Sequence, residues 1–357
     1  MGLPKDLISI FISFYRYKMA GLSVEERFEL VKRNTQEIVT EEELKNLLKK
    51  KKNPVVYWGT AVTGRPSLAY FFPLLKLSDF SRAGFKVKIL LADLHGALDG
   101  TPWIDLEHRY DFYKEAISQI LMALGSDLKK FEFVKGSEFQ LKPEYSYDIL
   151  KMASMNSVGE CKKAASEVVK MGENPALGGL IYPIMQALDE QYLEVDLQFG
   201  GVDQRKIFMF ARENLPGAGY DSRVEVMNPM IQGLVGKKMS SSDPKSKIDL
   251  TDDEKTIIEK VNKAYFLEGD PDCGIMEFLK YVIMTIKQDN KEKLLVERPT
   301  KFGGNVEYSH YSEIEKDVIE KKMHPMDLKN AIAKEIILLL NKVDKKKLLE
   351  LAKKAYK

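Results

Sequence analysis

The chain has 357 residues, of which 44% are hydrophobic and 30% charged, and its 55 basic residues nearly balance 53 acidic ones. This is a globular composition with enough apolar material for a large core, and the length predicts two domains or one large domain with an appendage. The net charge of +2 does not indicate a nucleic-acid-binding protein, so any such role must come from local patches. The two cysteines, Cys161 and Cys273, lack the spacing of a zinc site or a disulfide framework, which favours a reducing compartment.

Residues 1–22 are expected to form a flexible N-terminal extension. The apolar run Leu7–Phe14 is far shorter than the about 20 residues that span a bilayer, so no membrane segment is expected. Flanking lysines give this run a weak similarity to a signal peptide. We favour a loosely docked or disordered extension on a cytoplasmic protein, because the rest of the chain is typical of one.

Residues 23–52 predict two short helices. Ser23 and Thr40 are suitable N-cap residues, and each is followed by glutamates two to three positions later. The run of four lysines at 49–52 is interpreted as a solvated helix end, with a minor contact to an RNA backbone as the alternative.

From Pro54 the pattern changes to short β-branched runs that alternate with helical segments. The expected strands are Pro54–Trp58, Val87–Leu91, Phe131–Val134 and Val195–Phe199. Continuous apolar strands alternating with helices indicate an α/β fold, with a parallel sheet covered by helices on both faces. In such a sheet, ligands bind beyond the carboxyl ends of the strands.

After Asp252 the strand patterns stop and helical patterns continue to the end of the chain, interrupted by a turn at residues 302–304. This change of pattern predicts a sheet domain at 23–252 and a mainly α-helical domain at 253–357. The lysine-rich segment 342–357 is interpreted as a solvated tail rather than a contact to RNA phosphates.

A glycine-containing loop follows the strand that ends at Trp58. Gly59 and Gly64 allow the backbone to approach a ligand closely, and a helix beginning near Ser67 offers free N–H groups to phosphate. A structural turn would explain this loop equally well. The segment Ala92–His95 places polar groups after the next strand, where a functional and a structural histidine are about equally expected.

Tyr182, Gln186 and Asp189 have the spacing that puts them on one face of a helix. A phenol, an amide and a carboxylate in a row suit an amino-acid ligand, because they can bind an ammonium group or a phenolic hydroxyl. The alternative is a helix face packed at a domain seam.

Two later segments could bind a nucleotide. A strand leads into Gly200 and Gly201 and then into a helix whose first turn carries Asp203 and Gln204, which suits a ribose. Lys237–Ser242 combines lysines with hydroxyl groups, as in a polyanion clamp, although a flexible basic surface loop has a similar composition.

The order of these motifs resembles that of a class I aminoacyl-tRNA synthetase. Lys238–Ser242 occupies the position of the family's KMSKS signature, and Ser67–Tyr70 that of HIGH. The segments Tyr57–Thr60, Ala92–His95 and Gly200–Lys206 are similar to those of tyrosyl-tRNA synthetases of the archaeal and eukaryotic type. The resemblance runs from about Ser23 onward and implies a Rossmann-like catalytic domain with the KMSSS loop, followed by a helical anticodon-binding domain.

The resemblance implies the residues of each subsite. For tyrosine, Tyr57 and Asp189 bind the phenolic hydroxyl, while the residues that hold the ammonium group and frame the pocket are Tyr182, Gln186 and Gln204. For ATP, the implied residues are Gly59, Asp203, Lys238, Met239, Ser240, Ser241 and Ser242. Lys238, Ser67 and Tyr70 are the implied catalytic residues, Mg²⁺ accompanies ATP, and no side chain is assigned as a metal ligand.

The resemblance also implies partners. In the C-terminal domain Phe302 would stack on an anticodon base, and His324 and Asp327 would lie beside it, with the carboxylate accepting from a guanine edge. The family members act as homodimers. The helix expected at Tyr110–Leu124 has an apolar stripe that suits either such an interface or the protein core.

Two positions depart from the family pattern. Ser67 replaces the first histidine of HIGH, which could cost a few kcal/mol of transition-state stabilisation, by analogy with the loss of one preorganised donor. Ser241 replaces the second lysine of KMSKS, a variant usual in this branch.

The resemblance implies that the enzyme activates L-tyrosine with ATP, releasing pyrophosphate, and then transfers tyrosine to the 3′-terminal adenosine of tRNA(Tyr). One alternative is the sister enzyme for tryptophan, although an indole has no hydroxyl to bridge Tyr57 and Asp189. Another is a catalytically weak paralogue that binds tRNA-like RNA, which Ser67 would explain. A nucleotide-dependent dehydrogenase is disfavoured because the chain has no GxGxxG motif followed by an acidic residue.

Overall fold

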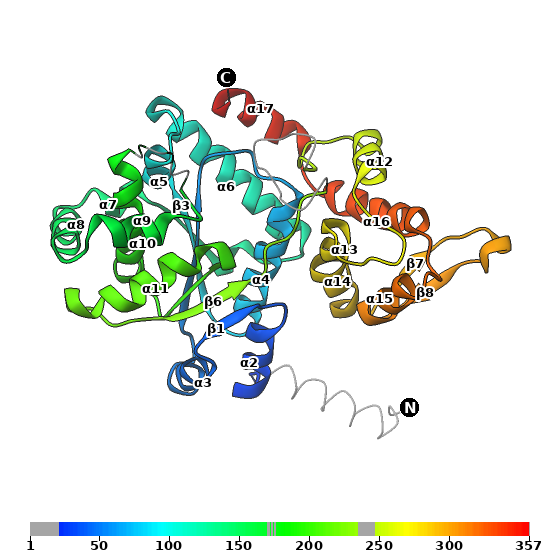
Figure 1. The fold of residues 1–357 in the computed structure, drawn as a ribbon, viewed down its shortest axis with the longest axis horizontal. Coiled ribbons are helices and arrows are strands. Elements are labelled where there is room, and N and C mark those ends of the chain that lie inside the picture. The colour runs from blue at the N-terminus through cyan, green and yellow to red at the C-terminus, as the bar shows by residue number, and fades with distance from the viewer. Residues whose placement is uncertain (1–20, 170–171, 173, 175, 235–246, 357) are drawn as a thin grey trace, which may run out of the picture.

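The computed structural model describes residues 21–169, 172, 174, 176–234 and 247–356. Most of the expected N-terminal extension and the whole segment Lys238–Ser242 lie outside these residues. Figure 1 shows a sheet with helices on both faces and a second group of helices beside it. In the described part of the chain, no helix is both long and apolar enough to cross a membrane.

The main sheet has six strands in the order β1-β6-β5-β2-β3-β4. All neighbouring strands are parallel except β1 and β6. The strands are β1 (Glu37–Val39), β2 (Val55–Ala61), β3 (Lys86–Ala92), β4 (Phe131–Lys135), β5 (Leu197–Gly201) and β6 (Val224–Asn228). The four predicted strands are confirmed as β2, β3, β4 and β5, whereas β1 and β6 were not predicted.

The strand order creates a crevice between β2 and β5. From β2 the chain continues to β3 and β4 on one side, whereas β5 continues to β6 on the other. The connections therefore diverge at the carboxyl ends of β2 and β5, which is where open α/β sheets bind ligands.

Helices cover both faces of this sheet. Alternate strand residues such as Val56, Ile89 and Phe199 pack with α4 (Phe71–Arg82) and α6 (Leu106–Ala123). Tyr57 and Leu90 point to the opposite face, where the covering helices are α8 (Pro143–Met155), α10 (Leu177–Tyr192) and α11 (Arg205–Asn214). The helix predicted at Tyr110–Leu124 is confirmed as part of α6, and core packing accounts for its apolar stripe.

The shorter helices begin largely as the sequence predicts. Ser23 and Thr40 both form capping boxes, with Glu26 and Glu43 as the reciprocal acidic residues. The helices that complete this half of the molecule are α2 (Val24–Lys32), α3 (Glu41–Lys50), α5 (Asp93–Leu98), α7 (Ser137–Gln140) and α9 (Val158–Ala165).

The C-terminal part is mostly helical, with α12 (Glu254–Lys263), α13 (Gly274–Phe278), α14 (Met284–Asp289), α15 (Tyr311–Ile319), α16 (Pro325–Leu340) and α17 (Lys345–Ala355). The prediction that strands stop after Asp252 was wrong, because β7 (Leu294–Val296) and β8 (Val306–Tyr308) form an antiparallel pair. These strands of three residues are too short to show an alternating pattern in the sequence.

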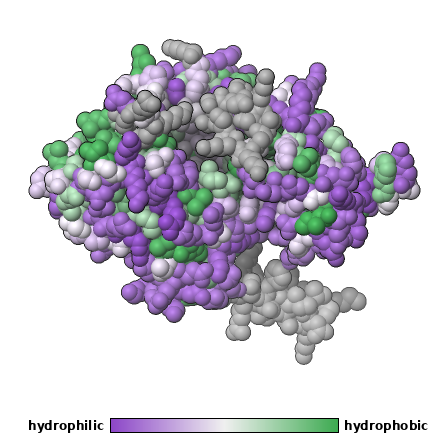
Figure 2. Space-filling model, in the orientation of Figure 1, coloured by the Kyte–Doolittle hydropathy of each residue, from purple (hydrophilic) through white to green (hydrophobic). Residues whose placement is uncertain are grey.

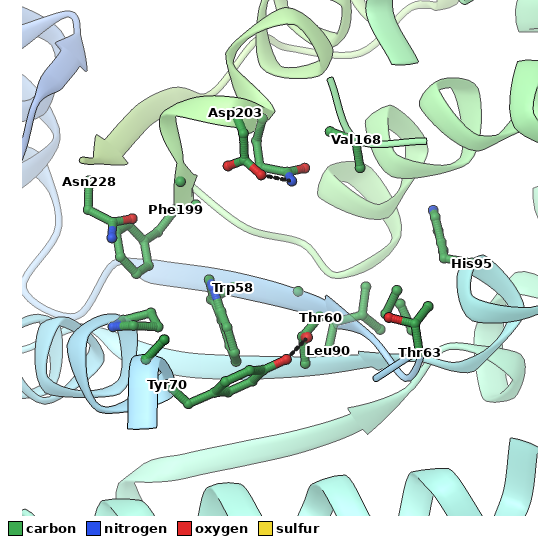
Figure 3. A pocket seen from close by; sticks show the side chains of 18 of the residues that line it. Trp58, Thr60, Thr63, Tyr70, Leu90, His95, Val168, Phe199, Asp203 and Asn228 are labelled. Carbon is green, nitrogen blue, oxygen red and sulfur yellow. Dashed lines mark hydrogen bonds between the residues drawn. The ribbon is translucent and has the colours of Figure 1, made fainter. Parts of the chain in front are cut away.

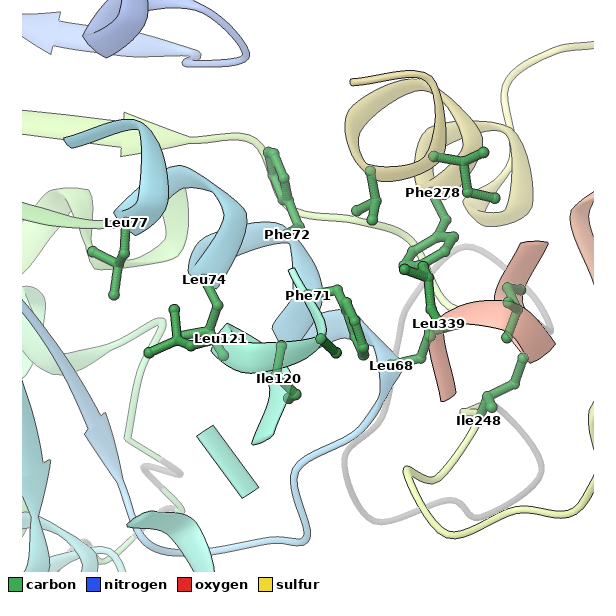
Figure 4. Packing of buried hydrophobic residues seen from close by; sticks show 14 of the residues in the cluster. Leu68, Phe71, Phe72, Leu74, Leu77, Ile120, Leu121, Ile248, Phe278 and Leu339 are labelled. Atoms are coloured by element: carbon green, nitrogen blue, oxygen red, sulfur yellow. The ribbon is translucent and has the colours of Figure 1, made fainter. Parts of the chain in front are cut away.

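One hydrophobic core joins the two parts of the molecule. Leu68, in the turn just before α4, and Phe71, the first residue of α4, pack into the same cluster as Ile248, Phe278 and Leu339 (Figure 4). The helices of the C-terminal part are therefore packed directly against the helix that follows the glycine loop.

The lysine-rich C-terminal segment is a packed helix, not the solvated tail predicted from its composition. α17 buries Leu348 and Ala352 and lies against α6. Beyond the helix, Tyr356 Oη donates to the carbonyl oxygen of Gly64 at 2.7 Å. Most lysines of α17 are exposed while Leu348, Ala352 and Ala355 are buried, a periodicity that average composition conceals.

Candidate active site

A cavity of about 480 Å³ opens at the carboxyl ends of β2 and β5. It brings together nine residues that the sequence assigned to the tyrosine, ATP and catalytic subsites: Tyr57, Gly59, Ser67, Tyr70, Tyr182, Gln186, Asp189, Asp203 and Gln204. Figure 3 shows part of its lining, with Asp203 opposite Trp58 and Tyr70. The proposed clamp residues Lys238, Met239, Ser240, Ser241 and Ser242 lie outside the described residues, but Lys247 also lines the cavity.

At the base of the cavity, Asp189 is almost completely buried. Its Oδ1 accepts hydrogen bonds from Gln140 Nε2 and Tyr145 Oη, both at 2.8 Å. Its Oδ2 accepts none from the described residues. A buried carboxylate oxygen without a donor is costly, so Asp189 is ready to accept a hydrogen bond from a ligand.

Tyr57 supplies the complementary group. Its hydroxyl oxygen accepts from Gln198 Nε2 at 2.5 Å, whereas its own O–H makes only a long contact of 3.5 Å to the carbonyl of Gln186. One donor and one acceptor therefore face the same cavity, and a phenolic hydroxyl can pair with both at once.

Burial controls the ionisation of these groups. Desolvation raises the pKa of Asp189 to about 7, although its hydrogen bonds to Gln140 and Tyr145 act in the opposite direction. Burial lowers the pKa of His95 to about 4, so this imidazole is neutral near pH 7. The 3.7 Å approach of His95 Nε2 to Asp189 Oδ2 is therefore not an ion pair at that pH.

For tyrosine, the ligand that the sequence resemblance implies, the raised pKa of Asp189 predicts pH-dependent binding. Because the pKa is about 7, the acceptor is mostly ionised at pH 8 and mostly protonated at pH 6. We expect the KM for tyrosine to rise about tenfold as the pH falls from 8 to 6, because the fraction of the protein with an ionised Asp189 falls by that factor. Steady-state kinetics from pH 6 to 8 would measure it, with the KM for ATP as the internal control. A KM for tyrosine that stays flat over this range would contradict the assignment.

The wall above Asp189 is formed by one face of α10. Gln186 Nε2 donates to Gln204 Oε1 at 3.1 Å, and the ring of Tyr182 lies edge-on to His95 with centroids 4.5 Å apart. The predicted alignment of Tyr182, Gln186 and Asp189 on one helix face is confirmed. The oxygens of Tyr182 and Gln186 suit an ammonium group better than an apolar ligand.

The opposite end of the cavity is formed by the glycine loop. A methyl group added at Gly59 would lie no closer than 3.5 Å to protein atoms, so the chain itself does not require glycine there. Tyr70 Oη shares a hydrogen bond with Thr60 Oγ1 at 3.0 Å. Ser67 is buried and extended, and its side chain caps no N–H of the turn that follows.

Four residues of the site were missed or left open by the sequence analysis. Gln140 and Tyr145 hold Asp189 from distant segments, and their sequence positions carry no visible pattern. Gln198 is a polar residue inside a buried apolar strand, which could have marked it as functional. His95 lines the cavity, although the sequence left its role undecided.

The three expected anticodon residues lie in two segments of the C-terminal part. Phe302 is 61% exposed in the turn between β7 and β8, while His324 caps α16 and Asp327 lies in its first turn. Arg298 links the segments, because its Nε donates to the carbonyl of Gly304 and its Nη1 to that of Lys322, both at 3.0 Å. In the described part of the chain, no group of three or more His, Cys, Asp or Glu side chains could hold a metal ion.

Comparison with known proteins identifies a family with this arrangement. Residues 49–341 match the model of the class I tRNA synthetases (W and Y). The chain is 45% identical over 328 residues to the cytoplasmic tyrosine–tRNA ligase of Danio rerio, covering 91% of this chain and 61% of that protein. It is 44% identical to the Saccharomyces cerevisiae enzyme of the same name, covering 91% of this chain and 84% of that one.

A solved structure is similar over nearly the whole chain. The tyrosyl-tRNA synthetase of Archaeoglobus fulgidus, crystallised with L-tyrosine, superposes with a TM-score of 0.85 at 39% identity, covering 92% of this chain and all of that one. The chain thus spans about three fifths of the vertebrate relative and the full length of the archaeal one.

Proposed function

This chain belongs to the class I tRNA synthetases, in the tyrosyl-tRNA synthetases of the archaeal and eukaryotic cytoplasmic type, and we propose that it is a tyrosine–tRNA ligase. The observation that carries the proposal is the pair at the base of the cavity. Asp189 Oδ2 lacks a donor among the described residues, and the Tyr57 O–H makes only the long contact of 3.5 Å to the carbonyl of Gln186. Asp189 can accept the proton of a phenolic hydroxyl, and Tyr57 can donate to the oxygen of the same hydroxyl. Phenylalanine lacks this group.

In the first step the carboxylate of L-tyrosine attacks the α-phosphorus of ATP and pyrophosphate leaves. The nucleophile is already an anion, so no protein base is needed and the protein acts by positioning and charge stabilisation. Tyr182, Gln186 and Gln204 hold the ammonium group, Asp203 holds the ribose and Gly59 lies against the adenylate. Lys238–Ser242 bind the phosphates, and Mg²⁺ that entered with ATP would offset part of the phosphate charge.

In the second step a ribose hydroxyl of the terminal adenosine of tRNA(Tyr) attacks the adenylate carbonyl, which forms tyrosyl-tRNA and releases AMP. We propose that the chain consists of an extension at 1–22, a catalytic domain at 23–252 and a C-terminal domain at 253–357. We assign the binding of the anticodon to the helical C-terminal domain. The exposed ring of Phe302 and the segments joined by Arg298 support this assignment.

The role of Phe302 can be tested separately from the chemistry. We expect Phe302→Ala to raise the KM for tRNA(Tyr) about tenfold, because stacking of one base on an aromatic ring contributes about 1–3 kcal/mol. Tyrosine-dependent ATP–pyrophosphate exchange should remain unchanged, since Phe302 lies outside the cavity. The exposed Leu295→Ala serves as a control on the same hairpin. Equal aminoacylation by both variants would exclude stacking on Phe302.

The hydroxyl of Ser67 is proposed to donate to the triphosphate in place of the usual histidine. We expect Ser67→Ala to lower kcat for ATP–pyrophosphate exchange about tenfold or more, with little change in the KM for tyrosine, because the donor acts on the transition state. Rapid-quench measurement of adenylate formation would detect it. An unchanged rate would show that the Ser67 hydroxyl makes no such contact.

We further propose that the enzyme acts in the cytoplasm as a homodimer. The exposed apolar side chains around α8 and α9 support an interface there: Leu141, Tyr147, Leu150, Met155 and Val158. Figure 2 shows hydrophobic residues at the left edge of the molecule, where Figure 1 places α8. This surface is a better candidate than the stripe on α6, which the core already buries.

The experiment that tests the activity is ATP–pyrophosphate exchange with tyrosine, phenylalanine and tryptophan, followed by charging of tRNA(Tyr). Exchange with tyrosine alone supports the proposal. Exchange with tryptophan would instead identify the sister activity. If no amino acid supported exchange while the protein still bound tRNA, the RNA-binding paralogue would be favoured. Ser67, in place of the first histidine of HIGH, would then be the expected cause of the lost activity.

A further inference from the structure

Behind the tyrosine pocket lie two buried glutamates that the proposed mechanism does not use. Glu190 is on α10, next to Asp189, and Glu225 is the second residue of β6; both are fully buried. None of their four carboxyl oxygens accepts a hydrogen bond from the described residues. Two ionised carboxylates in this situation would be very unfavourable.

The nearby arginines do not neutralise them through direct hydrogen bonds. Arg212 donates to Glu43 Oε1 at 2.5 Å and to the carbonyl of Arg223 at 2.8 Å. Arg223 donates to the carbonyl of Val195 at 3.1 Å and to Gln191 Oε1 at 2.7 Å. Both guanidinium groups are therefore directed to other partners, although their positive fields reach the glutamates.

Burial raises the pKa of both glutamates above the usual range for a carboxyl group. Glu190 raises that of Glu225 further and Asp189 raises that of Glu190, whereas Arg212 and Arg223 oppose these effects. The two pKa values remain raised after these opposing effects, which agrees with the absence of hydrogen-bond donors to either carboxyl group among the described residues. At least one of the two carboxyl groups is held as the neutral acid, which carries an O–H that needs an acceptor.

The sheet register places such an acceptor beside Glu225. Gln198 on β5 is paired with Glu225 on β6, and on its other side with Tyr57 on β2. Because paired residues of adjacent strands point to the same face, these three side chains form a row under α10. Gln198 Nε2 donates to Tyr57 Oη, and Gln198 Oε1 is buried without a donor among the described residues.

We propose that the Glu225 carboxyl is a neutral acid and donates its O–H to Gln198 Oε1, which fixes the direction of the hydrogen bonds that recognise tyrosine. The inference rests on the proposed tyrosine specificity. With Oε1 occupied, the amide must present Nε2 to Tyr57, and the Tyr57 O–H must then donate to the phenol oxygen of the substrate. The phenol keeps its own proton for Asp189.

An ionised Glu225 would reverse the direction of the hydrogen bonds along this row of side chains. An ionised Glu225 would attract Gln198 Nε2 and turn Oε1 toward Tyr57, whose O–H would then donate away from the substrate. The phenol proton could satisfy only Tyr57 or Asp189, so one buried group would remain unpaired. Glu225 is therefore a positioning residue that acts through Gln198 and Tyr57 without touching the substrate.

The test compares Glu225→Met, Glu225→Gln and the unchanged chain by the ratio of kcat/KM for tyrosine to that for phenylalanine. We expect Glu225→Met to lower this ratio about tenfold, because kcat/KM falls for tyrosine and stays unchanged for phenylalanine. Glu225→Gln should keep the ratio within about twofold, because its amide N–H can donate to Gln198 Oε1. In a Tyr57→Phe background, Glu225→Met should change the ratio no further. Equal losses with both amino acids, or an unchanged ratio in Glu225→Met, would overturn the proposal.

If Glu225→Met does not fold, the protonation of Glu225 can still be measured by infrared spectroscopy, which does not require catalysis. The infrared difference spectrum between the unchanged chain and Glu225→Gln at pH 7 should contain the carbonyl band of a protonated carboxylic acid. A carboxylate band in its place would overturn the proposal. If the chain activated no amino acid at all, the proposed function would fail, whereas the infrared result would still report the protonation of Glu225.

Discussion

Asp189→Asn should lower kcat/KM for tyrosine activation about a hundredfold while leaving activity with phenylalanine nearly unchanged. The asparagine Oδ1 can still accept from Gln140 and Tyr145, which now hold the carboxylate at 2.8 Å. Its Nδ2, however, presents a second donor to a phenol that Tyr57 already donates to. The phenolic proton then loses a charged acceptor, at a cost of about 3 kcal/mol, which corresponds to about a hundredfold.

Asp148→Asn provides a matched control for this prediction. Asp148 is also a buried carboxylate that accepts from tyrosine hydroxyls, namely Tyr192 at 2.8 Å and Tyr220, but it does not line the cavity. ATP–pyrophosphate exchange with tyrosine and phenylalanine should separate the two variants. If both lost activity equally with both amino acids, Asp189 would be a structural residue and not the specificity determinant. A site that pairs with a hydroxyl rejects the analogue without it by about 10⁴–10⁵, and this selectivity should fall in Asp189→Asn alone.

The second large effect is expected from Gly274→Ala, at the junction between the two parts of the molecule. A methyl group on Gly274 would lie 2.3 Å from the carbonyl oxygen of Gln232 and 2.6 Å from that of Gly233. These are backbone atoms that a rotamer change cannot move away. We expect the free energy of unfolding to fall by about 2–3 kcal/mol, as for other over-packed sites, measured by urea denaturation.

The same substitution should also slow adenylate formation. The backbone N–H of Gln232 donates to Glu277 Oε2 at 2.6 Å, so α13 holds the segment that leads to Lys238–Ser242. Moving that segment would shift Met230 and Ile231, which line the cavity. Gly159→Ala in α9 is the control, because its nearest neighbour would be 3.8 Å away and alanine favours a helix. If Gly274→Ala were as stable and active as Gly159→Ala, the junction would be more adaptable than its geometry indicates.

Periodicity made part of the site predictable. Tyr182, Gln186 and Asp189 share a helix face whatever the rest of the fold does, and β2 to β5 are apolar enough to be recognised. β6 escaped prediction because a buried glutamate interrupts its apolar run, and that glutamate is tolerated only in its tertiary surroundings.

The partners of Asp189 could not be predicted for a different reason. Gln140 and Tyr145 precede it by 49 and 44 residues, and they reach it only because α7 and α8 pack under α10. Nothing local in the sequence distinguishes these two residues from others of their type. The C-terminal helix was misjudged because its lysines dominate the composition, although every third or fourth residue is apolar.

The bond between Tyr356 and Gly64 has a consequence for how the chain folds during translation. It joins residues 292 positions apart, and N-terminal segments of a chain generally fold first as they leave the ribosome. The strands of the main sheet and α6, whose Tyr113 also donates to the carbonyl of Gly64, can therefore assemble while Tyr356 is still inside the exit tunnel. Before Tyr356 emerges, the glycine loop would be held from α6 but not yet from the C-terminal segment, so premature termination near α17 should weaken ATP binding more than tyrosine binding.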